Sequence, residues 1–112
     1  DEVRLPGALG ELGVLPGHTP LLTSLGVGPL TYFDGKSTQR VALREGFAEV
    51  LPDQVTVLAR VAERPEEIDV EGARHDLVSA EEGLKSASAD ELDELTARQR
   101  MAATRLEVAE TN

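Results

Sequence analysis

The feature that most constrains the fold of this chain is a change in the spacing of its apolar residues near position 64. Before that point, short runs rich in Val, Leu and Thr alternate with Gly, Pro and Asp, as in β-strands joined by turns. After it, apolar residues recur at intervals of three and four, which is the spacing of one helix face. We therefore expect an α+β chain with β-structure in residues 1–63 and helices in residues 64–112.

Two turn signals divide the first part into antiparallel strands. The Asp34-Gly35 pair tolerates the positive φ angles of a tight hairpin. Pro52-Asp53 also separates two apolar runs, which alternate with polar residues as half-buried strands do. Antiparallel strands at such short spacing favour a sandwich or a barrel. The strands expected around these turns cover residues 30–33, 38–43, 47–51 and 55–61.

The second part predicts two helices joined as a hairpin. The first helix is expected from about residue 66, and Ser88 with Glu91 matches the capping box that starts a second one. The short link at residues 85–90 makes the two helices antiparallel. The first apolar stripe contains Val70, Ala73, Leu77, Ala80, Leu84 and Ala87. The second contains Leu92, Leu95, Ala102, Leu106 and Ala109, interrupted by Gln99.

Composition excludes several classes of function. The formal net charge is -10, from 21 acidic and 11 basic residues, and this excess repels nucleic acid. The chain has no cysteine, and its two histidines, His18 and His75, have no metal-ligand spacing, so we expect neither a metal site nor a cofactor. No apolar run approaches the ~20 residues that span a bilayer, and no signal peptide opens the chain, so we expect no direct membrane insertion. No catalytic sequence motif occurs together with the strand, turn or helix that its chemistry requires.

The longest informative stretch is GELGVLPGHTPLLT, residues 10–23, which resembles the signature of the ε subunits of F-type ATP synthases. The segment EGFAEV, residues 45–50, resembles that family's segment after its central hairpin. Residues 55–59 resemble its last strand, and Ile68-Asp69 the start of its C-terminal helical hairpin. The resemblance covers nearly the whole chain in order. It lacks the family's leading strand, which together with the absence of a starting methionine suggests a trimmed N-terminus.

This resemblance implies a fold and a role. The fold is a flattened antiparallel β-sandwich followed by a two-helix hairpin. The role is that of a non-catalytic rotor subunit that binds the γ subunit and the polar loops of the c-ring during proton-driven ATP synthesis. Glu11 corresponds to a family position that faces the c-ring, and His18 to one at or near the γ contact. In a bacterium, which the helical layout favours, the subunit would lie on the cytoplasmic face of the plasma membrane as a peripheral part of the complex.

The resemblance also implies regulation, because in many bacterial relatives the hairpin leaves the sandwich, reaches the catalytic α/β subunits and suppresses ATP hydrolysis. Arg98, Arg100 and Arg105 are the candidates for such inhibitory contacts. The alternative, of at least equal weight, is that these arginines form ordinary i,i+4 ion pairs, such as Glu94 with Arg98. The alanines in the first stripe bury little area, and Gly72 and Gly83 each cost about 1 kcal/mol in a helix, so the folded hairpin depends on docking.

An alternative function is ATP sensing. Some relatives bind ATP on the folded hairpin through a motif reading I/L-D-x-x-R-A. Here Gly72 takes the arginine position, and Arg74 lies some 200° further round the helix, so only Asp69 and Arg74 are weak ATP candidates and binding is expected to be weak or absent. Asp69 has an alternative use as a helix N-cap. A third class, an unrelated soluble enzyme on a sandwich scaffold, lacks a set of convergent titratable groups.

Overall fold

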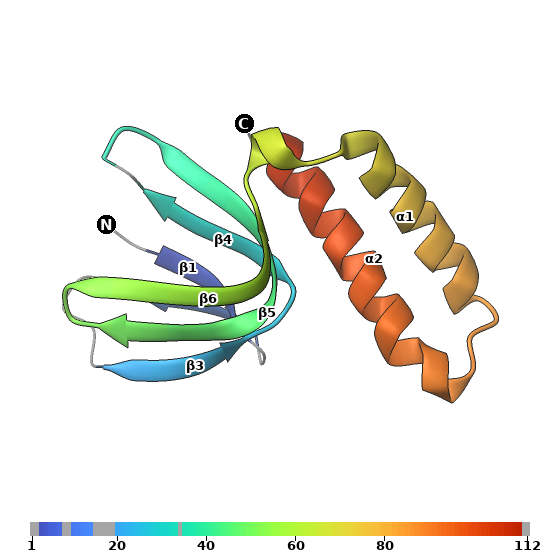
Figure 1. Cartoon of the computed structure of the whole chain (residues 1–112), viewed down its shortest axis with the longest axis horizontal. Helices are drawn as coiled ribbons and strands as arrows, with labels where there is room; N and C mark the ends of the chain where they lie inside the picture. Colours follow the sequence, from blue (N-terminus) through green and yellow to red (C-terminus); the bar gives the residue numbers. More distant parts are fainter. Residues whose placement is uncertain (1–2, 8–9, 15–19, 34, 111–112) are drawn as a thin grey trace.

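The computed structural model describes residues 3–7, 10–14, 20–33 and 35–110. It measures 47 × 30 × 17 Å, with the strands at one end and the helices at the other (Figure 1). The strands are β1 (Val3–Gly7), β2 (Gly10–Val14), β3 (Leu21–Leu25), β4 (Gly28–Phe33), β5 (Thr38–Leu51) and β6 (Gln54–Glu63). A 3-10 turn, η1 (Pro65–Glu67), leads to the helices α1 (Val70–Leu84) and α2 (Ala89–Glu110). The predicted α+β fold, a β-sandwich followed by a helical hairpin, is confirmed.

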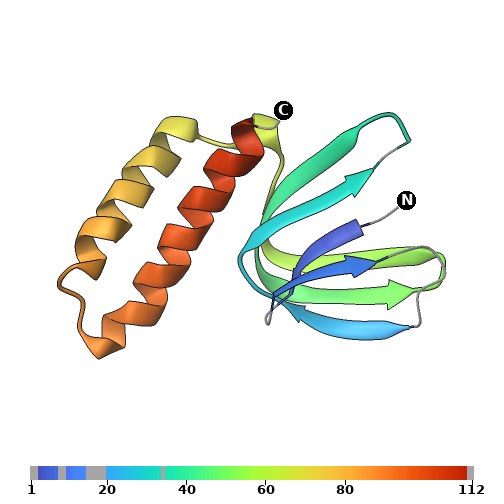
Figure 2. The same ribbon diagram turned by 180° about the vertical axis from the view of Figure 1, so that it is seen from behind.

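The long strand β5 organises the sheet. Its first half pairs with β4, in a register that runs from Phe33 opposite Thr38 to Gly28 opposite Leu43. Its second half pairs with β3, and β6 runs antiparallel along the other side of β5. Figure 1 shows β6, β5 and β3 side by side, and Figure 2 shows β1 and β4 from behind. Both predicted hairpins are confirmed, because β4 pairs with β5 and β5 pairs with β6 across Pro52-Asp53.

Residues 38–43 and 47–51 were expected to be separate strands, and this prediction is wrong. They are one strand that bends at Glu45, whose φ of 49° is the one positive value among the non-glycine residues that the structure describes. Before the bend Leu43 faces the sandwich core, and after it Ala48 and Val50 do, so the inward face changes from odd to even positions. Strands that cross between the sheets of a sandwich turn in this way. The left-handed conformation costs roughly 1–2 kcal/mol for a residue with a Cβ.

Gly46 follows this bend, at a position where the neighbouring strand leaves no space for a side chain. A Cβ added there would lie 2.0 Å from the carbonyl oxygen of Leu58 and 2.8 Å from the Cα of Ala59. Both are backbone atoms of β6, which cannot move without breaking the ladder. The bend therefore requires glycine at position 46 because of the close approach of two strands.

Two hydrophobic clusters stabilise the molecule, one in the sandwich and one beneath the helices. The sandwich cluster contains Leu5, Leu25, Leu30, Leu43, Ala48 and Val50. The second cluster joins Ala42 of β5 to Met101 and Val108 of α2, with Val27, Val61 and Ile68 packed against it. The helices are therefore held to the sandwich by a cluster separate from the sandwich core. No helix in the described ranges is both long enough and apolar enough to cross a membrane.

Helix α1 begins at Val70, four residues later than the sequence suggested. Pro65 starts the separate turn η1, and Ile68 and Asp69 are extended. The Asp69 carboxylate then caps the helix by accepting a hydrogen bond from the N–H of Gly72 at 3.0 Å. The N-cap use of Asp69 is therefore confirmed, and the predicted apolar stripe, which starts at Val70, starts where the helix does.

Helix α2 begins after Ser88, as the capping box predicts. The Glu91 carboxylate accepts hydrogen bonds from the Ser88 backbone N–H at 3.2 Å and from the Ser88 hydroxyl at 2.9 Å. These bonds, the backbone one first, lower the pKa of Glu91 because they stabilise its ionised form. The reciprocal bond of the box does not form, because the Glu91 N–H donates to the Ser88 carbonyl oxygen at 3.1 Å and not to the Ser88 hydroxyl.

The predicted apolar stripe of α2 is only partly correct. Leu92 is exposed, whereas Met101, Thr104 and Val108, which the stripe omits, are buried. The reason is that α2 lies between α1 and the sandwich and needs two covered faces (Figures 1 and 2). One stripe at helical spacing describes only the face turned to α1. Where the helices meet, Gly83 lies so close to Leu95 that an added Cβ would be 3.2 Å from a leucine methyl.

Candidate functional site

The outer face of β3, β5 and β6 carries large apolar side chains in solvent. Phe47 is 57% exposed, Leu58 is 71% exposed and Leu22 is 71% exposed. Phe47 and Leu58 are directly opposite each other on neighbouring strands. Leu22 pairs with Glu49, two residues along β5 from Phe47, so its side chain is the diagonal neighbour. We call these three residues the apolar face. Contiguous exposed apolar side chains of this kind mark interaction surfaces in soluble proteins.

The charged residues beside the apolar face include Glu45, Glu49 and Arg60. Glu49 is exposed and lies opposite Leu22. The Glu45 carboxylate lies 3.6 Å from Arg60 through its Oε2 atom and 3.3 Å from Arg44 through its Oε1 atom. The rim of the apolar face therefore has two carboxylates, of Glu45 and Glu49, and one guanidinium, of Arg60, and is weakly acidic.

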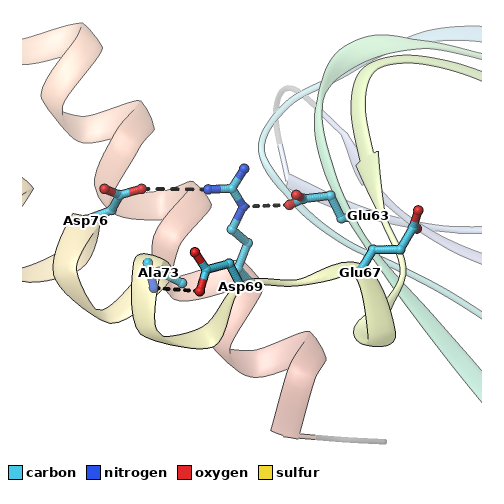
Figure 3. Close-up of a pocket in the computed structure, with 7 residues that line it drawn as sticks. Glu63, Glu67, Asp69, Ala73 and Asp76 are labelled. Carbon is cyan, nitrogen blue, oxygen red and sulfur yellow. Dashed lines mark hydrogen bonds and ion pairs between the residues drawn. The ribbon is translucent and has the colours of Figure 1, made fainter.

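A second region of interest is the contact between the hairpin and the sandwich, which includes a short ion pair. The Nε atom of Arg105, on α2, lies 2.6 Å from Oε1 of Glu63, at the end of β6. The Nη1 atom of Arg105 lies 3.8 Å from Asp76 of α1. Arg105 and Glu63 are only 27% and 24% exposed, so solvent screens this pair less than a surface pair. One arginine therefore joins the sandwich and both helices (Figure 3).

A pocket of about 150 Å³ lies beside this ion pair, between the end of β6, η1 and the helices. It is lined by Glu63, Glu67, Asp69, Gly72, Ala73, Asp76 and Arg105. Four of these side chains are carboxylates and one is a cation, which is already paired. The described residues include no group of three or more His, Asp or Glu side chains placed to hold a metal ion.

The structure separates the two ATP candidates named from the sequence. Asp69 lines the pocket and caps α1. Arg74 does not line it, and its guanidinium pairs with Glu71 one turn earlier on the exposed side of α1. The position that could bring a cation to the pocket is occupied by Gly72.

The three arginines proposed for inhibitory contacts lie in different surroundings. Arg105 is held by Glu63 and Asp76, whereas Arg98 and Arg100 are exposed and have no ion pair within the described part of the chain. Glu94, the alternative partner for Arg98, instead lies 3.4 Å from Nη2 of Arg44 on β5. The alternative pair of Glu94 with Arg98 is therefore not formed, and Glu94 instead joins α2 to the sheet.

Of the two positions assigned to partner contacts, Glu11 lies in β2, where its backbone is opposite Pro6. His18 lies outside the residues that the structure describes.

Sequence reasoning missed the apolar face, although a signal for it was present. The two-residue turn Pro52-Asp53 fixes Leu51 opposite Gln54, and counting back from it places Phe47 opposite Leu58. Since Ala48 and Val50 point into the core, Phe47 must point outward. No comparable signal announces the pairs of Arg105 with Glu63 or Arg44 with Glu94, because these partners are 42 and 50 positions apart.

Comparison with known proteins identifies the family of the chain. Residues 1–65 match the family model described as ATP synthase, Delta/Epsilon chain, beta-sandwich domain. An ATP synthase epsilon chain of Koribacter versatilis is 49% identical over 87 residues, covering 78% of this chain and 61% of the relative. One of Geobacter sulfurreducens is 50% identical over 93 residues, covering 83% and 67%. The chain thus spans between three fifths and two thirds of the length of these curated relatives.

Solved structures show the same fold. A chain in the mitochondrial ATP synthase of Euglena gracilis, a structure of OSCP, F1 and the c-ring, matches with a TM-score of 0.68 and 26% identity, covering 97% of this chain and 65% of that one. A chain in the central stalk and c-ring of the Tetrahymena thermophila enzyme matches with a TM-score of 0.63 at 10% identity, covering 97% and 81%, and supports the fold alone. This chain belongs to the ATP synthase delta/epsilon family.

Proposed function

We propose that this protein is a non-catalytic rotor subunit of an F-type ATP synthase, which links the γ subunit to the c-ring. The observation that carries the proposal is the apolar face, because Leu22, Phe47 and Leu58 form an exposed docking surface on a rigid sheet. Covering a Phe or Leu side chain contributes about 1.5–3 kcal/mol each. Such a surface binds a partner and transmits force without making or breaking a covalent bond. Family membership supports the choice of partner.

In this proposal the γ subunit covers the apolar face, and the c-ring meets the sandwich through β2. Glu11 in β2 is assigned to the c-ring contact and His18 to the γ contact, both from the family resemblance. In a bacterium the complex would hold the chain on the cytoplasmic face of the plasma membrane as a peripheral subunit.

The test is binding of the purified chain to the γ subunit. Phe47→Ser and Leu58→Ser are each expected to weaken γ binding by about tenfold or more, since a buried side chain of this size is worth more than 1.4 kcal/mol. Phe33→Ser is the matched control, because Phe33 is also exposed but lies at the far end of β4. If the wild-type chain does not bind γ, or if Phe33→Ser weakens binding as much as Phe47→Ser, the assignment of the apolar face to γ binding is wrong.

A regulatory role for the hairpin is part of the same proposal. Docked on the sandwich, the hairpin leaves Arg98 and Arg100 exposed and holds Arg105 in its ion pair. Extension toward the catalytic subunits would release Arg105 to acidic surfaces there. ATP hydrolysis by the reconstituted catalytic complex should therefore be slower with the full chain than with a chain ending at Glu63. Equal rates would remove the inhibitory role and leave the coupling role intact.

ATP sensing is the second candidate, and the charges in the pocket argue against it. A triphosphate there would meet Glu63, Glu67, Asp69 and Asp76, with Arg105 as the one cation among the lining residues. Carboxylates next to phosphates repel them, so we predict weak or absent binding of Mg-ATP. An NMR titration to millimolar nucleotide, followed at Asp69 and Arg74, tests this. Saturation at micromolar nucleotide would contradict the prediction and establish a sensor.

A further inference from the structure

Glu45 combines an unfavourable backbone conformation with a full set of side-chain contacts. Its φ of 49° lies in the left-handed region, which glycine adopts without cost but a residue with a Cβ does not. A residue kept in a left-handed conformation points to a function of its side chain. Both oxygens of the Glu45 carboxylate are engaged, Oε1 by Arg44 and Oε2 by Arg60.

These contacts form one line of alternating charge across the molecule. It begins at Arg60, on β6 two residues after Leu58 and on the same side of the strand. It passes through Glu45 to Arg44 and ends at Glu94 on α2. We call these four residues the charge line. One end therefore touches the apolar face and the other end touches the hairpin.

Arg44 is the residue that can transmit an effect along the charge line. Its side chain is only 24% exposed, and its Nε atom faces Glu45 while its Nη2 atom faces Glu94. Fixing an arginine side chain costs rotamer entropy, and once Glu45 has fixed it the bond to Glu94 forms at lower cost. Glu45 is therefore a positioning residue for the contact between Arg44 and Glu94.

That contact matters for the first half of α2 in particular. The buried residues of this helix, Met101, Ala102, Thr104 and Val108, all lie in its second half. Residues 89–94 are exposed throughout. The bond from Arg44 to Glu94 thus ties to the sheet a part of the helix that has no fully buried side chain.

We propose that the charge line couples occupancy of the apolar face to docking of the hairpin, a regulation that rests on the proposed function. The rim of the apolar face carries two carboxylates, Glu45 and Glu49, and one guanidinium, Arg60. A partner surface that fits this face therefore has an apolar centre surrounded by basic side chains. In the proposed function this partner is the γ subunit. A basic group of the partner draws Glu45 toward itself. Arg44 then loses its support, and the first half of α2 loosens from the sheet.

The test in the free chain is amide hydrogen exchange of residues 90–98, followed by NMR. Arg44→Gln and Glu94→Gln are each expected to speed this exchange about two- to fivefold, the range of an exposed ion pair, and the double variant no further. Glu45→Gln, which keeps the side-chain size and the backbone preference, is expected to speed it about twofold. Arg98→Gln, a nearby arginine without an ion pair in the described structure, is the matched control and should behave as wild type. Exchange in Glu45→Gln at or below the wild-type rate would overturn the proposal.

The same amides are then followed with the γ subunit bound. Exchange in wild type should rise about two- to fivefold on binding, and the rise should be absent in Glu45→Gln. Binding without a rise, or an equal rise in Glu45→Gln, overturns the coupling and leaves the rotor assignment intact. If γ does not bind, the rotor assignment fails, and the free-chain comparison decides by itself whether Glu45 positions Arg44.

Discussion

Single residues set the shape of this sandwich at the bend of β5. Glu45 provides the positive φ and Gly46 provides the space, because the Leu58 carbonyl lies where a Cβ would be. The sequence predicts a break between two strands at residues 44–46, but here the Glu45-Gly46 pair lies inside one continuous strand. The residue type shows which backbone conformations are accessible, and the neighbouring strand decides which of them the chain adopts.

Gly46→Ala should therefore be strongly destabilising. The new methyl would overlap backbone atoms that cannot move aside, and we expect a loss of about 3 kcal/mol or more in the free energy of unfolding, measured by urea denaturation. Gly35→Ala is the control, since Gly35 has a φ of 95° but no atom within 4 Å of the added Cβ. The free energy of unfolding of Gly35→Ala should fall only by the cost of the left-handed conformation, about 1–2 kcal/mol. Equal losses for both variants would contradict the steric explanation.

At the scale of elements, the hairpin is held by one compact apolar cluster and by ion pairs. Of the pairs, Arg105 with Glu63 is the shortest between helix and sandwich in the described residues and lies largely out of solvent. Arg105→Met, which keeps an unbranched apolar stem but removes the guanidinium, should weaken docking by about 1–3 kcal/mol because it leaves the Glu63 carboxylate unpaired. Amide exchange in α1 and α2 measures this loss. Arg98→Met, an exposed position on the same helix, should change exchange by less than about 0.5 kcal/mol.

The start of α2 should depend on pH through Glu91. Its pKa is lowered in the folded chain, so its contribution to stability is complete above the unfolded pKa, ordinarily about 4.3, and is lost as pH falls through the lower folded value. Chemical shifts of residues 89–92, followed from pH 6 to 2, should show this loss of helix. Ser88→Ala should keep most of this pH-dependent loss of helix, because the bond from the Ser88 backbone N–H is the largest cause of the lowered pKa of Glu91. Glu91→Gln should abolish it, and an unchanged transition in that variant would assign it to another group.

At the scale of the whole molecule, the sandwich and the hairpin have separate hydrophobic clusters, so we predict that the hairpin can open while the sandwich stays folded. Val108 belongs to the cluster under α2 and Val50 to the sandwich core, and both are fully buried. Val108→Ala should cost about 1–3 kcal/mol and speed exchange in the helices alone. Val50→Ala should cost a similar amount and speed exchange throughout the sandwich. Equal effects of Val108→Ala on strands and helices would show that the two parts unfold as one unit.

The sequence by itself determined the two-part layout, both turns of the hairpins and the start of α2. These features depend on periodicity, on turn residues and on a cap, and each acts within a few positions along the chain. The family resemblance could likewise be read from consecutive residues. The two-residue turn at Pro52-Asp53 even determined the register that sets Phe47 opposite Leu58.

Only the tertiary structure decided the bend at Glu45, the position of α2 between α1 and the sandwich, and the partners of Arg105, Arg44 and Glu94. Each depends on groups brought together from distant parts of the chain, such as Glu63 and Arg105, 42 positions apart. Local spacing describes one face of one element at a time. A helix covered on two sides, or a strand that crosses between sheets, is defined by its neighbours, because packing and ion pairing are contacts in space.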